Sequence, residues 1–171
     1  MESINKNFES KIEDKMSVGF GKNVKSEFAF HHNVKLELRD ADGNLKDIRE
    51  IHNTVTNAGL YGIMDQILAS PTLAKAGWME VGTGTGGTTK LNAYIVGSRT
   101  ALTSKTRNNA VVTFVCTFGA GVGTGAITEC GLFDVVTQDT INMWLYSTFA
   151  VINKAAGDSL TVTWTLTAAA A

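Results

Sequence analysis

Proline, cysteine and long apolar runs are all scarce in this sequence of 171 residues. No stretch approaches the run of about 20 apolar residues that a membrane-spanning helix needs, and residues 1–15 lack the apolar core of a secretory signal peptide. We therefore expect that the protein is made in a cytoplasm and has no membrane partner. Cys116 and Cys130 lie among apolar neighbours, which favours two buried free thiols over a disulfide.

Charge is scarce in the second half of the chain. Of the 15 basic and 16 acidic residues, 19 lie in the first 50 positions and only five follow residue 107, whereas all 21 threonines follow His52. The net charge of −1 and the pI of about 6.3 are unlike those of a dedicated nucleic-acid binder. We expect no nucleic-acid partner, and the length favours one domain with or without an additional arm.

Residue groupings that support catalysis or metal binding are also lacking. The three histidines all precede residue 53, and the sequence has no G-x-S-x-G, H-E-x-x-H or C-x-x-C motif. Glu129 and Asp134 have the residue types of a glycosidase acid pair, but across a short strand or turn we expect them to cap backbone groups. We predict a protein that is not an enzyme and holds no metal or cofactor.

A glycine-rich segment follows a short strand predicted over residues 78–81. Gly82, Gly84 and Gly87 satisfy G-x-G-x-x-G, but a dinucleotide site also needs a helix and an acidic residue about 20 positions later. No acidic residue lies between Glu80 and Glu129. We therefore predict a loop in which two backbones pass closely.

The same acid-free stretch contains four basic residues. They are Lys90, Arg99, Lys105 and Arg107. This local positive charge predicts either contact with an acidic protein surface or simple solvation.

Residues 1–27 differ from the rest and are expected to form an extended or partly helical arm. Apolar residues recur every four positions among charged ones, which is the narrow stripe of a charged helix. The alternatives are a frayed tail and an arm that docks on a neighbouring subunit, and we favour docking. The predicted partner-binding residues are Ile4, Phe8, Ile12, Met16 and Phe20.

Residues 28–53 predict a β-hairpin at the start of a single domain over residues 28–171. Apolar Val34, Leu36 and Leu38 alternate with charged residues, and residues 40–44 form a turn signal. Symmetric pairing about the turn would place His32 opposite His52, where cross-strand packing is favoured over a metal site. The turn also fits a calcium loop poorly, because glycine is misplaced and the bidentate glutamate is missing.

One helix is predicted in this domain. Leu60, Ile63, Met64 and Ile67 have the i, i+3, i+4, i+7 spacing of an apolar face. Thr56 or Asn57 can cap its start, and we expect it to end near residues 69–70, before the lone proline at position 71.

The remaining segments predict strands. One apolar face is formed by residues 112, 114, 116 and 118, a second by residues 141, 143, 145, 149 and 151, and a third by residues 160, 162, 164 and 166. Threonines occupy much of the opposite faces, as suits a solvated strand surface. The fold class predicted is mainly β, a jelly-roll-like β-sandwich with one short helix.

Four segments, in order, form a recognisable set. They are 53–60, the Gly-Thr-Gly-Thr loop that begins at Gly82, 127–134 and 153–167. Together they resemble a family of tailed-bacteriophage virion proteins, variously head-decoration, head-fibre and tail-fibre-like. The resemblance covers about residues 34–167, with Cys130 where alanine is usual. Its motif residues here are Asn53, Thr54, Thr56, Asn57, Gly59, Gly82, Gly84, Glu129, Gly131, Phe133, Asp134 and Trp164.

The resemblance implies a non-enzymatic β-sandwich module of virion assembly, often a homotrimer. The small size and the arm favour a decoration or cement protein on the capsid surface, bound to the major capsid protein or another virion protein. The alternative is a tail, baseplate or fibre adaptor, in which exposed Trp144 and Tyr146 stack on receptor sugars or line a trimer interface.

Overall fold

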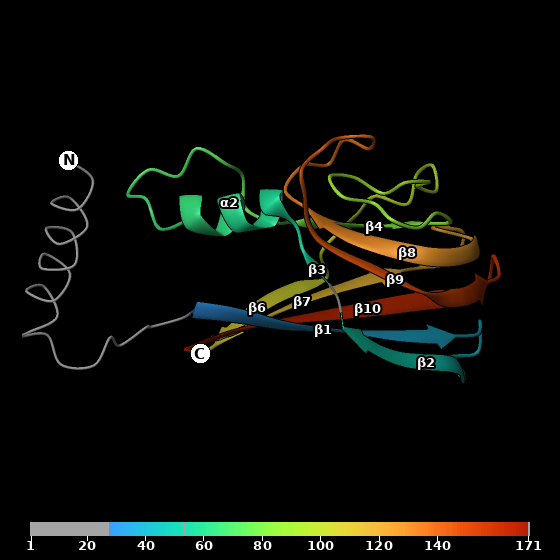
Figure 1. Cartoon of the computed structure of the whole chain (residues 1–171). Helices are drawn as coiled ribbons and strands as arrows, with labels where there is room; N and C mark the ends of the chain where they lie inside the picture. Colours follow the sequence, from blue (N-terminus) through green and yellow to red (C-terminus); the bar gives the residue numbers. More distant parts are fainter. Residues whose placement is uncertain (1–27, 53, 171) are drawn as a thin grey trace, which may run out of the picture. The chain divides into compact units, whose positions relative to one another are not determined.

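The computed structural model describes residues 28–52 and 54–170 (Figure 1). These residues form ten strands and one helix. The elements are β1 (Phe28–Arg39), β2 (Leu45–His52), β3 (Thr54–Val55), α2 (Asn57–Asp65), β4 (Trp78–Gly82), β5 (Thr100–Ala101), β6 (Ser104–Asn108), β7 (Val111–Phe118), β8 (Gly125–Phe133), β9 (Met143–Lys154) and β10 (Ser159–Ala170).

The strands form two five-stranded sheets. One has the order β2-β1-β10-β7-β6 and the other β3-β9-β8-β4-β5. Neighbours such as β7 and β10, or β8 and β9, pair antiparallel, and Figure 1 shows the two sheets in separate layers. The prediction of a mainly β, sandwich-like fold with one short helix is confirmed.

The core lies between the sheets. It combines Leu36, Val162 and Trp164 from one sheet with Val81 and Leu132 from the other, all fully buried or nearly so. The strict alternation predicted for residues 160–166 is confirmed. Residues 160, 162, 164 and 166 are buried, and the threonines between them are half-buried on the other face of the strand.

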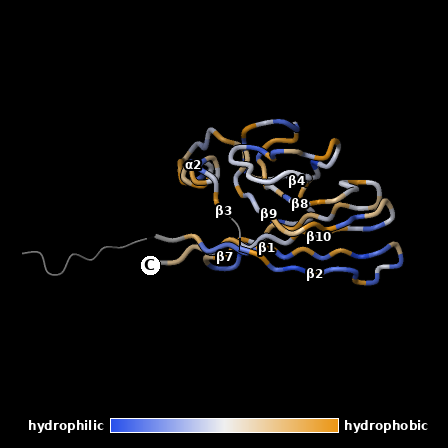
Figure 2. The backbone as a smooth tube through the Cα atoms, turned by 45° about the vertical axis from the view of Figure 1, so that its right-hand side comes forward, coloured by the Kyte–Doolittle hydropathy of each residue, from blue (hydrophilic) through white to orange (hydrophobic). Residues whose placement is uncertain are grey.

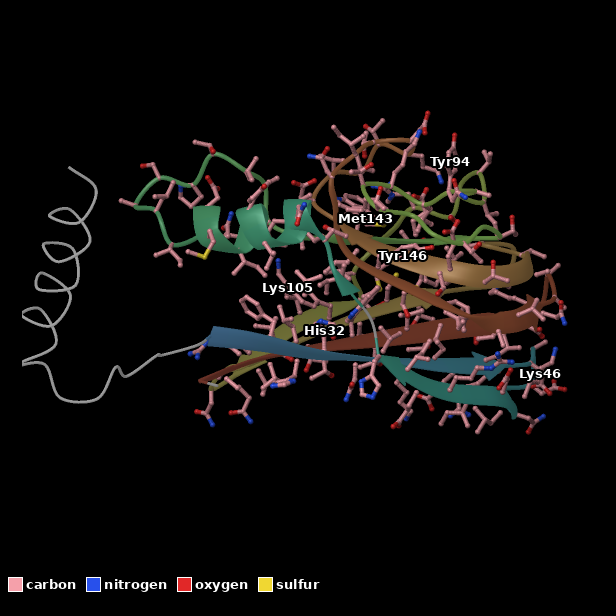
Figure 3. All side chains as sticks on the ribbon, viewed as in Figure 1. His32, Lys46, Tyr94, Lys105, Met143 and Tyr146 are labelled. Atoms are coloured by element: carbon pink, nitrogen blue, oxygen red, sulfur yellow. The ribbon has the colours of Figure 1, made fainter. Side chains whose placement is uncertain are left out.

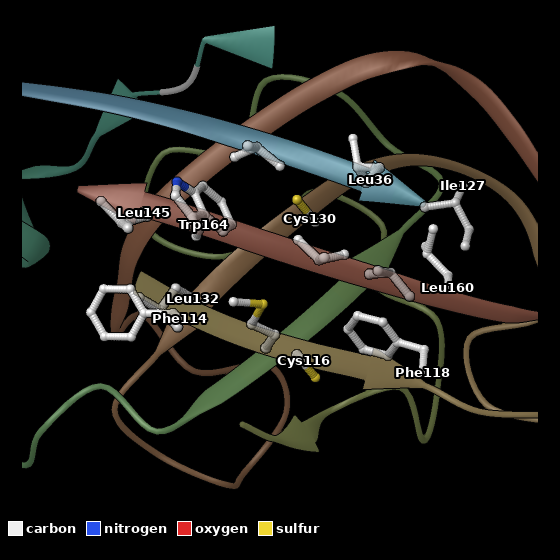
Figure 4. Close-up of a cluster of buried hydrophobic side chains, with 14 of the residues drawn as sticks. Leu36, Phe114, Cys116, Phe118, Ile127, Cys130, Leu132, Leu145, Leu160 and Trp164 are labelled. Atoms are coloured by element: carbon white, nitrogen blue, oxygen red, sulfur yellow. The ribbon is translucent and has the colours of Figure 1, made fainter. Parts of the chain in front are cut away.

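Both cysteines lie in this core (Figure 4). Cys116 on β7 and Cys130 on β8 are buried and free, as predicted. In contrast to these core strands, β2 lies at the edge of its sheet, and its trace is mostly hydrophilic in Figure 2.

The predicted hairpin is present, but its register differs from the symmetric one. His52 pairs with Asn33 and not with His32, because the register shifts between Leu38 and Arg39. The Asp40 carboxylate accepts the amide hydrogens of Asp42 and Asn44 at 3.0 and 2.8 Å, so it stabilises the turn itself. Within the turn, Gly43 has a φ of 84°, which glycine adopts at little cost.

The helix begins as predicted and ends earlier. Thr56 is its N-cap, and its hydroxyl accepts the Gly59 amide at 3.0 Å. The last helical residue is Asp65, well before the expected end near residues 69–70. Its carboxylate accepts the amides of Thr72 and Leu73 at 3.0 and 2.9 Å, which fixes the following loop in a turn.

The predicted apolar face of the helix is wrong. The buried helix residues are Gly59 and Gly62, Ile63 is half-buried, and Leu60 and Met64 are 38% and 59% exposed. The reason is close contact with Trp144 of β9: a Cβ at Gly62 would lie 2.2 Å from the Trp144 ring. Only the side of the helix that carries the two glycines can approach β9 this closely.

The single apolar face predicted for residues 141–151 is also wrong. All residues from Met143 to Ser147 are buried, and farther along β9 it is Ile152 that is buried, while Val151 is 44% exposed. The pairing of β9 with β8 has two register shifts, which break the alternation. Met143 also packs with Leu91 from the loop between β4 and β5 in a second apolar cluster, so β9 is covered on both faces.

Candidate functional site

The glycine-rich loop is held by a buried carboxylate. Glu129 of β8 is fully buried, and its oxygens accept the backbone N–H groups of Gly84 at 3.2 Å, Asn92 at 3.3 Å and Ala93 at 2.8 Å. The hydroxyl of Tyr146 donates to the same carboxylate at 3.0 Å. The prediction that Glu129 caps backbone groups is confirmed.

Two glycines make this arrangement possible. A Cβ at Gly82 would lie 2.6 Å from Glu129 Oε1, and one at Gly84 would lie 2.8 Å from the same atom. The loop amides that a nucleotide phosphate would need are thus directed at a protein carboxylate, and the next secondary-structure element is the short strand β5, not a helix. The loop has the close backbone approach that the sequence predicted.

The phenol of Tyr146 is part of the same cluster. Burial, with a contribution from the hydrogen bond to Glu129, raises the pKa of Tyr146 to about 12. Tyr146, which is labelled in Figure 3, is 8% exposed. With Trp144 at 7% exposure, the prediction that these two aromatics are surface residues is wrong.

A second buried carboxylate is paired with a cation. Arg99 Nη2 lies 2.8 Å from Glu80 Oε2, and both side chains are almost completely inaccessible. The guanidinium also stacks over the Phe133 ring, 3.5 Å from its centroid, and donates to the Val135 carbonyl at 2.8 Å. Gln138 donates to the other oxygen of Glu80. These contacts fix the loop after β8 against β4.

The basic stretch is therefore not one surface. Arg99 is buried, and Lys90 forms an exposed ion pair with Asp139. Lys105 and Arg107 of β6 donate to the carbonyls of Ala76 and Asn109, respectively, at 2.9 and 2.7 Å. Among the described residues, neither of these two β6 cations has an acidic partner within ion-pair distance.

The segment from Glu129 to Asp134 is buried along its whole length. A Cβ at Gly131 would lie 2.8 Å from both Met143 Sδ and the Phe133 ring. Asp134 is nearly buried: Asn142 Nδ2 donates to its Oδ2 at 3.4 Å, and its Oδ1 has no hydrogen-bond partner among the described residues, so the prediction that Asp134 caps a backbone group is wrong. The two acids are not presented together as an open pair, and Trp164 is a core residue at 0% exposure.

The motif that precedes the helix joins it to β9. The Thr56 hydroxyl, besides capping α2, contacts the carbonyl oxygens of Met143 and Trp144. A Cβ at Gly59 would lie 2.1 Å from the Trp144 carbonyl oxygen. Asn57 is the exposed first helical residue, Thr54 pairs with Tyr146 through the backbone, and Asn53 lies outside the described residues.

An apolar cavity of about 230 Å³ lies between the sheets beneath α2. Its lining includes Phe30, Phe114, Trp144, Leu166 and Ala168 from the strands and Ile63 from the helix. Gln66 and the Trp144 indole supply the only polar side-chain groups of the lining within the described part of the chain. No sequence motif predicted this cavity. Small residues in its lining, such as Ala168, leave the space unfilled and are the one signal of it in the sequence.

A second hollow of about 430 Å³ adjoins this cavity and shares Gln66, Val112, Phe114 and Trp144 with it. Its remaining lining includes three exposed cations. They are Lys75, Lys105 and Arg107. We call the cavity and this hollow together the α2 groove; Figure 3 shows Lys105 below the helix, where the groove lies.

The outer side of α2 and the turn that follows it are apolar. Leu60, Tyr61, Met64 and Ile67 are between 38% and 72% exposed. Together with the groove, they give this end of the sandwich an apolar character typical of a protein-binding surface.

The partner-binding residues predicted from the sequence all belong to the arm (residues 1–27). Ile4, Phe8, Ile12, Met16 and Phe20 all lie outside the described residues. Within residues 28–52 and 54–170, no three His, Cys, Asp or Glu side chains are arranged to hold a metal ion. No helix in that part of the chain has the length and apolar character needed to cross a membrane.

The chain was compared with known proteins at three levels. Protein-family models, curated proteins and solved structures gave no match.

Proposed function

We propose that this chain is a non-enzymatic structural protein of a tailed-phage virion, a decoration or cement protein on the exterior of the head. The proposal rests on the resemblance of four ordered segments and on the surface formed by α2 and its groove. In this role the chain binds the major capsid protein or another virion protein and associates with itself, with a homotrimer as the expected state.

The observation that carries the proposal is the apolar end of the sandwich. The cavity of the α2 groove is lined almost entirely by hydrocarbon, and Met64 and Ile67 beside it are 59% and 72% exposed. Soluble monomers rarely present such a continuous apolar region, and burial against a protein stabilises an assembly by about 25 cal/mol for each Å² removed from water. In an assembly protein, such a surface is buried against a partner protein.

The use of the buried carboxylates supports a structural role. Glu129 accepts three backbone amides and a phenol, and Glu80 is paired with Arg99. Groups held in this way stabilise loops, whereas a catalytic carboxylate needs a substrate within hydrogen-bonding distance. Their arrangement favours a rigid scaffold over a hydrolase.

Decoration of a capsid relies on many weak contacts made at once. A subunit that contacts the lattice and its own neighbours gains avidity because each further contact is intramolecular once the first has formed. The arm (residues 1–27) and the apolar end of the sandwich are the two parts proposed to make these contacts. The particle surface is accordingly the proposed location after assembly in the host cytoplasm.

The test is the location of the chain in a particle. Mass spectrometry of separated heads and tails should find it on heads, and deletion of residues 1–24 should lower its occupancy on purified heads. A chain present only in tails would reject the decoration role in favour of a tail, baseplate or fibre adaptor. Undiminished occupancy after the deletion would reject a role for the arm.

A further inference from the structure

We propose that the α2 groove binds a fatty-acid-like ligand, an unbranched hydrocarbon chain with a single carboxylate at one end. The hydrocarbon chain occupies the apolar cavity beneath α2, and the carboxylate lies among the cations of the adjoining hollow. This inference goes beyond the proposed virion role, because the site is complete in one copy of the protein. The outer side of α2, with Met64 and Ile67, stays exposed for a protein partner.

The cavity has the chemistry of a hydrocarbon site. Its lining includes Phe30, Ile63 and Leu166, and within the described part of the chain the only polar side-chain groups of the lining belong to Gln66 and Trp144. Gln66 Nε2 already donates to the Leu73 carbonyl at 3.1 Å. An alkyl chain brings no polar group into this space, whereas a peptide backbone would bring N–H and C=O groups that find no partner there.

The size of the cavity indicates the length of the hydrocarbon chain. An apolar cavity of about 150 Å³ binds benzene, which has a ring of six carbons. In proportion, a cavity of about 230 Å³ has room for about nine carbons. With the carboxyl carbon placed in the hollow, decanoate is the unbranched acid that fits best.

The adjoining hollow provides the site for the carboxylate. It shares Gln66 and three apolar or aromatic residues with the cavity, so one ligand can extend through both. Lys105 and Arg107 are two positions apart on β6, and their side chains therefore lie on the same face of the strand. Lys75 lines the hollow as well, and the lining has no acidic side chain in the described part of the chain.

These three cations lack an anion. None of them lies within ion-pair distance of a carboxylate among the described residues, and Lys105 and Arg107 donate only to backbone carbonyls. The carboxylate next to Gln66, that of Asp65, accepts the amides of the following loop instead. A ligand carboxylate in the hollow is attracted by all three cations, and a guanidinium can bind it through two hydrogen bonds.

Cations on an edge strand also have a simpler role. β6 is at the edge of its sheet, and inward-pointing charges there hinder pairing with another chain. That role accounts for Lys105 and Arg107. It accounts neither for Lys75, which lies in the loop between α2 and β4, nor for an apolar cavity that opens beside the three charges.

The experiment is isothermal titration calorimetry of the purified full-length protein with a series of acids. Below the concentrations at which they self-associate, hexanoate, octanoate and decanoate should each bind one molecule per chain. The affinity should rise about fourfold for each added CH₂ up to decanoate and level off at dodecanoate. Decanol and decylamine have the same chain length without the anion, and should bind at least about tenfold more weakly than decanoate.

Variants test the two halves of the site separately. The double substitution Lys75→Met, Arg107→Met should weaken decanoate binding at least about tenfold and leave decanol binding unchanged. Ala168→Leu adds bulk to the cavity lining and should move the preferred ligand from decanoate to octanoate. Lys90→Met removes a cation that is paired with Asp139, and this control should bind decanoate like the wild type. Thermal melting without ligand checks that each variant is folded.

Three outcomes would overturn the proposal. They are the absence of saturable decanoate binding, equal affinities for decanoate and decanol, and an unchanged chain-length preference in Ala168→Leu, which a loss of stability alone would not shift. The measurements use purified protein without particles. Their failure would leave the virion role standing, and a chain found only in tails would reject the head location and leave this site standing.

Discussion

The backbone N–H of Gly84 donates a 3.2 Å hydrogen bond to the Glu129 carboxylate, which lies 45 positions later in the sequence. Two motifs that are separate in the sequence are thus one structural unit. The fully buried Glu129 is the common acceptor for the loop between β4 and β5, and the glycines allow the loop backbone to reach it. This relationship explains how a side chain of the protein itself holds the glycine-rich loop.

Replacement of Glu129 by alanine should destabilise the protein. The substitution leaves the amides of Gly84, Asn92 and Ala93 and the hydroxyl of Tyr146 without their acceptor, and unsatisfied buried groups cost about 1–3 kcal/mol each. We expect a loss of at least about 3 kcal/mol in the free energy of unfolding, measured by urea denaturation. Glu50→Ala, at an exposed position of β2, is the control and should leave the midpoint unchanged.

Alanine at either buried glycine of α2 should destabilise the protein, although alanine is the better helix former by about 1 kcal/mol. A methyl group at Gly59 or Gly62 would lie 2.1 or 2.2 Å from Trp144 atoms, so the helix must move away from β9. We expect a net loss of about 1–3 kcal/mol. Gly119→Ala, where no atom lies within 4 Å of the new Cβ, should melt like the wild type. A melting temperature raised by the helix substitutions would contradict this packing.

Removal of the buried cation should cost more than removal of a surface cation. Arg99→Met leaves the carboxylate of Glu80 buried without its partner, a change that costs about 3–5 kcal/mol. Lys90→Met breaks an exposed ion pair with Asp139 and should leave the melting temperature unchanged. In a double-mutant cycle, Glu80→Gln with Arg99→Met should cost less than the sum of the single substitutions. Additive costs would mean that the two side chains are not coupled.

Stability should fall as the pH is lowered through about 6.5. Burial, together with the charges of His31 and His52, lowers the pKa of His32 below the usual 6.5 in the folded chain. Below this pH the unfolded chain binds a proton that the folded chain resists, so the free energy of unfolding decreases. Thermal melting between pH 7.5 and pH 5 should show the decrease, and His32→Asn should make it smaller. An identical decrease in both proteins would exclude His32 as its source.

The two thiols should be inert in the folded protein. Burial raises the pKa of Cys116 to about 12, and burial with the neighbouring Glu129 carboxylate raises the pKa of Cys130 as well. Because the thiolate is the reactive form, an aromatic disulfide reagent at pH 8 should label neither thiol until denaturant is added, and then both. Rapid labelling of the native protein would show that the core opens readily.

Local patterns were sufficient for much of the fold. The alternation of Leu160 to Leu166 with threonines fixes which face of β10 is buried, because successive strand side chains point to opposite sides. The turn with Gly43 and the cap at Thr56 depend on contacts within four residues along the chain. Such features are readable because the atoms that decide them are close in the sequence.

Patterns failed where distant segments meet. The periodicity of α2 suggested that Leu60 and Met64 are buried, but contact with Trp144 needs the glycine side of the helix. The hairpin register was off by one residue, because a shift near Arg39 cannot be read from alternation. Arg99 was predicted among solvated or surface-binding charges, but it is buried beside Glu80, which lies 19 positions earlier.

By itself, the sequence determined the fold class, the first hairpin, the start of the helix and the burial of both cysteines, since propensity and periodicity are local properties. Tertiary contacts were needed to show that Glu129 holds the glycine-rich loop, that Trp144 and Tyr146 are covered, and that an apolar cavity lies beneath α2. The physical reason is that burial and the pairing of buried polar groups depend on which distant segments come together, and no short stretch of sequence contains that information.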